Sequence, residues 1–116
     1  HSSAASDVYK RQIKLIKSNL EKMIALIKQN KSKVLLMQIR IPPNYGQKYM
    51  LAFEKIYKDL ALSEEVYLLP FMLEEIGINS ELMQPDGIHP NKKAQSLIAK
   101  DVKKNIDKFL LINQSN

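Results

Sequence analysis

The residues best suited to chemistry lie in one short stretch, residues 83–91, which reads Met-Gln-Pro-Asp-Gly-Ile-His-Pro-Asn. It holds His89, the one histidine away from the N-terminal residue, and Asp86 lies three positions before it. An imidazole works as a base near neutral pH only when a partner fixes its tautomer and orientation, and a carboxylate is the usual partner. We therefore predict that Asp86 accepts the Nδ1 proton of His89 and leaves Nε2 free as a base.

The neighbours of this pair favour a tight loop before a helix. Gly87 supplies the backbone freedom to fold the loop back on itself. Pro90 restricts His89 to an extended conformation and prepares a helix start. The same spacing is typical of a surface turn that caps the last helix, so spacing alone leaves both interpretations open.

The segment Asp-Gly-Ile-His-Pro-Asn at residues 86–91 resembles the last conserved block of the SGNH (GDSL-type) hydrolases, which supplies two of three triad members. Residues 36–46, 68–71 and 83–84 resemble, in the same order, the thioesterase/lysophospholipase/arylesterase branch of that family. The similarity runs from about residue 13 to about residue 111 and corresponds to the C-terminal half of that fold.

The resemblance implies an α/β fold: the C-terminal part of a three-layer α/β/α SGNH-hydrolase (flavodoxin-like) domain, with two parallel strands and three main helices. We expect residues 1–12 to be a non-native, linker-like segment, loosely ordered or helical only as an extension of the helix after it. Residues 13–112 form the half-domain, and residues 113–116 form a polar tail.

Hydrophobic periodicity predicts the same elements. Apolar residues at three- and four-residue spacing predict an amphipathic helix from residue 13, a second one over 47–62, and a final helix with Asn91 as its N-cap. The predicted inward stripes are Ile13, Ile16, Leu20, Met23, Ile24 and Ile27; Met50, Phe53, Tyr57 and Leu60; and Ala94, Leu97, Ile98, Val102, Ile106 and Phe109.

Two short apolar runs, 34–39 and 66–69, predict strands. The first is apolar on both faces, as in a parallel sheet covered by helices, and the loss of its neighbour would leave an open apolar edge. Residues 72–76 predict a short helical turn before an irregular stretch.

Residues 39–42 follow the first predicted strand, and ligands of open parallel sheets bind beyond the carboxyl ends of strands. The resemblance implies that Ile39, Arg40, Ile41 and Pro42 bind substrate, with the first three lining an acyl pocket and residues 43–49 forming a mobile loop beside it. The alternative is that Ile39 and Ile41 pack in the core while Arg40 is a surface cation.

The resemblance implies hydrolysis of carboxylic ester or thioester bonds by a Ser-His-Asp mechanism, with an acyl ester or thioester as substrate and without cofactor or metal. Such catalysis needs a serine nucleophile and oxyanion donors. The Gly-Asp-Ser and Gly-Asn-Asp segments that supply them in the family do not occur in the sequence, and neither Ser80 nor Ser96 has a setting that would replace the nucleophile. We therefore expect the chain alone to be inactive and to need the N-terminal half of the domain as its partner.

Composition bounds the remaining alternatives. The chain has 116 residues and a net charge of +6, and its excess of lysine is spread over several helical segments, so we expect a solvated surface and no nucleic-acid partner. The absence of cysteine excludes disulfides and thiolate zinc sites. The sequence contains no run of about 18 apolar residues, so it predicts no membrane span. A basic helical binding module and a non-catalytic α/β subdomain that needs a partner chain stay open as alternatives, and the resemblance implies a periplasmic or secreted protein.

Overall fold

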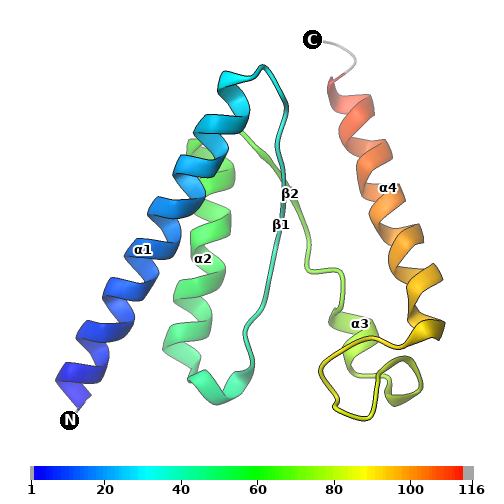
Figure 1. The fold of residues 1–116 in the computed structure, drawn as a ribbon, viewed down its shortest axis with the longest axis horizontal. Helices are drawn as coiled ribbons and strands as arrows, with labels where there is room; N and C mark the ends of the chain where they lie inside the picture. Colours follow the sequence, from blue (N-terminus) through cyan, green and yellow to red (C-terminus); the bar gives the residue numbers. More distant parts are fainter. Residues whose placement is uncertain (1, 114–116) are drawn as a thin grey trace. The chain divides into compact units, whose positions relative to one another are not determined.

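The computed structural model describes residues 2–113 (Figure 1). In chain order its main elements are α1 (Ser2–Gln29), β1 (Leu35–Met37), α2 (Gln47–Ser63), β2 (Tyr67–Leu69), α3 (Glu74–Gly77) and α4 (Gln95–Asn113). Short 3-10 helices η1 (Pro43–Tyr45), η2 (Ser80–Leu82) and η3 (Lys92–Ala94) lie between them. The two strands pair in parallel, which confirms the predicted α/β class. The chain divides into two compact units, His1–Leu68 and Leu69–Asn116, and each is described separately.

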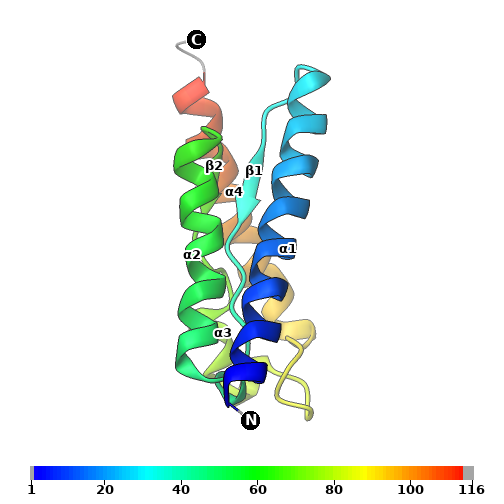
Figure 2. The ribbon, with the colours of Figure 1, turned by 90° about the vertical axis from the view of Figure 1, so that its left-hand side faces the viewer.

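In the first unit, α1 and α2 lie side by side (Figures 1 and 2). Phe53, Tyr57 and Leu60 of α2 are buried as predicted, and Leu60 is fully enclosed. They form one core with Ile24 of α1 and with Val34, Ile56 and Val66, and Ile13, Ile16 and Leu20 pack against it. The 3.6-residue periodicity thus predicted both helices, and the structure adds that they pack against each other.

The predicted stripe of α1 was too wide. Met23 and Ile27 are 50% and 39% exposed, whereas Ile24 between them is buried. In this unit α1 contacts α2 as its main helical neighbour, and a contact with one helix buries a narrower stripe than a full core does. The helix begins at Ser2, so the segment before residue 13 is helical as an extension of α1. Its assignment as a linker-like segment stays a prediction.

The strands are shorter than predicted. Val34 is buried and accepts a hydrogen bond from the Tyr67 N–H at 3.2 Å, but β1 ends at Met37. Met37 and Ile39 are 44% and 48% exposed, so the strand is not covered on both faces as expected. A sheet of two strands offers one neighbour to β1, which limits both its length and its burial.

The second unit places a loop between short helical turns and α4. α3 overlaps the predicted turn at 72–76 and ends one residue beyond it. Asn91 is an N-cap as predicted, but of η3, which leads into α4; its side chain accepts a hydrogen bond from the Ala94 N–H at 3.2 Å. Ala94 and Phe109 are buried, but Leu97 and Ile106 are 44% and 39% exposed, contrary to the prediction, because α4 is covered within this unit by short elements only.

The predicted polar tail begins at the last residue of α4. Asn113 ends that helix, and residues 114–116 lie outside the described residues. Among the helices described, none combines the length and apolarity that crossing a membrane requires.

Candidate active site

The loop that carries the predicted pair is closed by backbone hydrogen bonds. Met83 and Pro90 form an antiparallel bridge, and the Gln84 N–H donates to the His89 carbonyl at 2.7 Å. The Gly87 N–H turns back to the Gln84 carbonyl at 2.9 Å, and Gly87 has a φ of +68°. This left-handed conformation favours glycine, which explains how the chain reverses within so few residues.

The loop brings Asp86 and His89 together as predicted. Asp86 Oδ2 lies 2.7 Å from His89 Nδ1, and Asp86 Oδ1 accepts the backbone N–H groups of Ile88 at 2.9 Å and His89 at 3.0 Å. An ionised carboxylate only accepts hydrogen bonds, so Nδ1 carries the proton in this contact, and in the neutral form of the imidazole the lone pair is then on Nε2. The carboxylate therefore fixes both the tautomer and the rotamer of the imidazole.

These contacts also lower the pKa of Asp86 to about 2, from an ordinary 3.8. The largest cause is the hydrogen bond from the His89 side chain, followed by those from the backbone N–H groups of Ile88 and His89. Each favours the charged form of the carboxyl group. Asp86 is consequently an anion at neutral pH, as the partner of a catalytic histidine must be.

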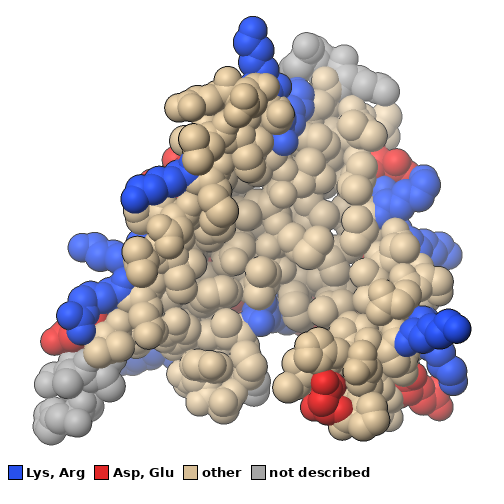
Figure 3. All heavy atoms as spheres, viewed as in Figure 1, with Lys and Arg blue, Asp and Glu red and all other residues tan. Residues whose placement is uncertain are grey.

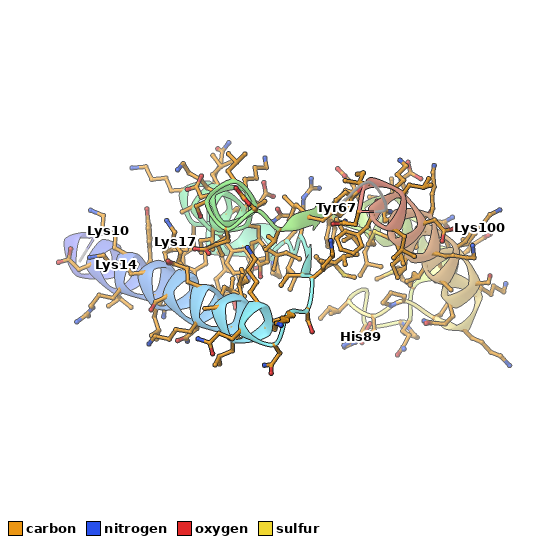
Figure 4. All side chains as sticks on the ribbon, turned by 90° about the horizontal axis from the view of Figure 1, so that it is seen from above. Lys10, Lys14, Lys17, Tyr67, His89 and Lys100 are labelled. Atoms are coloured by element: carbon orange, nitrogen blue, oxygen red, sulfur yellow. The ribbon has the colours of Figure 1, made fainter. Side chains whose placement is uncertain are left out.

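The pair lies at the surface of its unit. The His89 side chain is 68% exposed and that of Asp86 is 42% exposed, and Figure 4 shows His89 at the edge of the loop before α4. A cavity of about 450 Å³ borders the loop and is lined by Ile78, Met83 and Pro85 among others, while a larger one of about 610 Å³ lies along α3 and α4. Neither has Asp86 or His89 among its lining residues.

The four residues predicted to bind substrate belong to the first unit, whereas Asp86 and His89 belong to the second. Ile39 is 48% exposed, Pro42 is exposed, and Ile41 is half-buried against the core of its unit. Arg40 Nε lies 3.2 Å from Glu54 Oε1 of α2. The packing of Ile41 fits the alternative that this residue belongs to the core. The role of all four residues in substrate binding stays a prediction.

Two features of this region escaped the sequence analysis. Glu54 pairs with Arg40, and no sequence pattern indicates a contact between residues so far apart. Gln38 is buried to 8% exposure, and its Oε1 has no hydrogen-bond partner among the described residues, although Nε2 donates to the Ile39 carbonyl at 3.0 Å. The position of this polar residue inside the apolar run Leu-Met-Gln-Ile was the one sequence feature that could have indicated its burial. In the described part of the chain, no three His, Cys, Asp or Glu side chains gather as a metal site would require.

Comparison with known families gives one match that covers most of the chain. Residues 3–102 match the family model of the GDSL-like lipases and acylhydrolases. An arylesterase of Vibrio mimicus is 47% identical over 97 residues, which is 84% of this chain and 48% of that protein. A thioesterase 1/protease 1/lysophospholipase L1 of Escherichia coli K12 is 48% identical over 80 residues, or 69% of this chain and 38% of that protein.

Solved structures of esterases also superpose on this chain. The esterase EstA of Pseudoalteromonas superposes with a TM-score of 0.82 at 35% identity, covering 84% of this chain and 54% of that one. A structure of TesA superposes with a TM-score of 0.73 at 37% identity, covering 81% and 52%. The chain thus spans about half the length of these solved structures, and half or less of the curated relatives.

Proposed function

This chain belongs to the family of GDSL-like lipases and acylhydrolases, and from that premise we propose that it carries the base and the orienting acid of a Ser-His-Asp hydrolase acting on carboxylic esters or thioesters. The observation that carries the proposal is the Asp86–His89 contact of 2.7 Å, with the same carboxylate held by two backbone N–H groups. A turn that only capped a helix would not need an imidazole aimed by an anion.

In the proposed mechanism, His89 Nε2 removes the proton of a serine hydroxyl as its oxygen attacks the carbonyl carbon of the substrate. The imidazolium that forms is stabilised by Asp86, which stays ionised. His89 then gives the proton to the departing alkoxide or thiolate, and an acyl-enzyme results. Water repeats the sequence with His89 again as the base, releases the acid and restores the serine.

The hydroxyl and the oxyanion donors must come from polypeptide outside these 116 residues, because the sequence contains no Gly-Asp-Ser or Gly-Asn-Asp segment. We propose that the chain by itself is inactive for this reason. Its partner is a segment equivalent to the N-terminal half of the relatives. Met37 and Ile39 expose apolar side chains, and the buried Oε1 of Gln38 between them has no partner within residues 2–113; both observations support a further segment packing at this end of β1.

We also propose that Ile39, Arg40, Ile41 and Pro42 line the acyl site once that segment is present. Ile39 supports this role because it offers an exposed apolar side chain just beyond β1. The resemblance also implies a periplasmic or secreted location. Fractionation of cells that express the whole gene would test that prediction.

The alternative of a basic binding module gains little from the arrangement of cations. Figures 3 and 4 show Lys and Arg side chains distributed along α1 and α4, among them Lys10, Lys14, Lys17 and Lys100. Lys28 donates to the Glu64 carbonyl, and Lys17 lowers the pKa of Asp59 after the stronger effect of Lys55, so part of this charge is used within the unit.

The experiment that tests the proposal is complementation. The chain is co-expressed with the part of the Vibrio mimicus arylesterase that it does not cover, and hydrolysis of a p-nitrophenyl ester is measured on the purified complex. We expect activity only with both parts present. His89→Ala should lower kcat by about 10⁴-fold or more, whereas Lys93→Ala, an exposed residue two positions beyond Asn91, should leave it unchanged. Activity that survives His89→Ala would refute the assignment of the base, and a purified complex without activity would refute the hydrolase proposal.

A further inference from the structure

Asn91 makes more hydrogen bonds than a helix cap requires. Its Oδ1 accepts the Ala94 N–H at 3.2 Å, which is the cap itself. Its Nδ2 donates to the carbonyls of Glu81 at 2.6 Å and Met83 at 3.3 Å, and its backbone N–H donates to the Leu82 carbonyl at 2.8 Å. Three consecutive carbonyls are thus bound by one residue.

These contacts join the two ends of the loop that carries the pair. Residues 81–83 lead directly into the loop, and Asn91 follows Pro90 at its other end. The Met83–Pro90 bridge and a hydrogen bond of 3.3 Å from Gln84 Nε2 to the Pro90 carbonyl lie between them. The side chain of Asn91 therefore links the end of η2 and Met83 to the start of η3, with the loop held between them.

We infer that Asn91 is a positioning residue for the His89–Asp86 pair. The donor arm of its side chain, the bonds from Nδ2 to Glu81 and Met83, fixes the separation of the loop ends. This separation sets where the backbones of residues 86 and 89 lie, and so holds Oδ2 and Nδ1 within hydrogen-bond distance. The acceptor arm, the bond from the Ala94 N–H to Oδ1, only starts the helix.

The exposure of the pair is the reason why such an anchor matters. A buried histidine is held by the side chains packed around it, but His89 and Asp86 are 68% and 42% exposed. Ordering exposed side chains costs conformational entropy, and a hydrogen bond weakens steeply when its ends move apart. The orientation of the imidazole must then come from the backbone beneath it, which the bonds of Asn91 hold in place.

Two variants separate the arms. Asn91→Ser keeps an oxygen that can cap the helix but removes the Nδ2 donors, whereas Asn91→Ala removes both. Asn105→Ala is the matched control: this asparagine lies on α4, and its Nδ2 donates to the Asp101 carbonyl at 2.9 Å, away from the loop.

The readout is the tautomer of His89, measured from its ring-nitrogen chemical shifts by NMR on the full chain at about pH 8, where an ordinary imidazole is neutral. We expect mainly the Nδ1–H tautomer in the unsubstituted chain and in Asn105→Ala, and a several-fold smaller share of it in both Asn91 variants. The Ala94 N–H also donates to the Asn91 carbonyl at 3.1 Å, so amide-exchange protection at Ala94 should fall only in part in Asn91→Ala and persist in Asn91→Ser.

Ring-nitrogen shifts in Asn91→Ser equal to those of the unsubstituted chain would overturn the inference, because the loop would then hold the pair through its own hydrogen bonds. So would an Asn105→Ala variant that loses the tautomer equally. If Asn91→Ala does not fold, Asn91→Ser decides alone. The inference rests on the proposed function only for the catalytic meaning of the pair. The NMR experiment tests geometry and the complementation assay tests hydrolysis, so the two can fail separately.

Discussion

Titration of the Asp86 carboxyl group tests the candidate pair in this chain directly. Its pKa is lowered to about 2 by His89 and by two backbone N–H groups, against an ordinary 3.8. At pH 3, a group with a pKa of 2 is about 10% protonated, whereas one with a pKa of 3.8 is about 86% protonated. This large difference makes pH 3 the most informative single condition.

The sign of the pH effect is set by the direction of the shift. Because folding lowers the pKa of Asp86, its contribution to the free energy of unfolding is fully present above about pH 3.8, the value of the unfolded chain. That contribution is lost as the pH falls from there through about 2. At pH 3, in the middle of that window, part of the contribution is lost, although most folded chains still carry Asp86 as an anion.

The assay is a carboxyl ¹³C NMR titration, with the Asp86 signal assigned by its loss in Asp86→Asn. In the unsubstituted chain we expect a midpoint near pH 2. His89→Ala removes the largest cause of the shift but keeps the backbone N–H groups of residues 88 and 89, so its midpoint should rise and still stay below 3.8.

Signals from the Leu60 methyl groups, which lie in the core of the first unit, follow folding during the same titration. A midpoint near 3.8 in a chain that these and the loop amides report as folded would refute the preformed pair. A midpoint near 2 that did not respond to His89→Ala would show that backbone hydrogen bonds, and not the imidazole, hold the carboxylate.

Three further substitutions test packing and backbone. Leu60→Ala should lower the free energy of unfolding by about 3 kcal/mol in a denaturant titration, because Leu60 is 0% exposed, whereas Leu62→Ala on the same helix at 82% exposure should change it by less than about 0.5 kcal/mol; equal effects would mean that the core is not formed. Gly87→Ala should lower the free energy of unfolding by about 1 kcal/mol through its φ of +68° alone, since no described atom lies within 4 Å of the added carbon. Gly77→Ala, which is equally open but has no positive φ, should not lower it. A Gly87→Ala variant as stable as the unsubstituted chain would contradict the left-handed conformation of the loop. Gln38→Met should change the free energy of unfolding of the isolated chain by less than about 1 kcal/mol, because it removes a buried Oε1 without a partner among the described residues but also the hydrogen bond from Nε2 to the Ile39 carbonyl. The same substitution should weaken the complex with the completing segment if that segment supplies a donor to Oε1; a complex as tight as that of the unsubstituted chain would refute such a donor.

The features that the sequence predicted correctly are local ones. Helix α2 was placed to within one residue because its apolar residues recur at helical spacing and a Pro-Pro-Asn-Tyr-Gly break precedes it. The Asp86–His89 contact was predicted because three residues and one glycine can bring these side chains together without help from elsewhere. The cap at Asn91 was predicted for the same reason.

Features that depend on distant segments were not predicted. Glu54 lies on α2, fourteen positions after Arg40, and the fold of the first unit brings them to 3.2 Å. The donor arm of Asn91 reaches back ten positions to Glu81. A propensity for capping says nothing about where the other half of an amide will bind, so sequence reasoning found one function of Asn91 and missed the second.

On α1 and α4 the wrong predictions about burial have a common direction that carries information, whereas on α2 the error runs the other way: Ile56 is 3% exposed and was not predicted to lie inward. Met23, Ile27, Leu97 and Ile106 were all placed inward by periodicity, and all are exposed in the structure by 39% or more. Periodicity shows how wide an apolar stripe each helix has, whereas the structure shows how much of that stripe the other residues of this chain cover. On α1 and α4, errors of propensity would scatter in both directions. An excess of apolar residues on the exposed side of α1 and α4 instead fits a chain whose helices pack against additional polypeptide, which is what the proposed hydrolase site also requires.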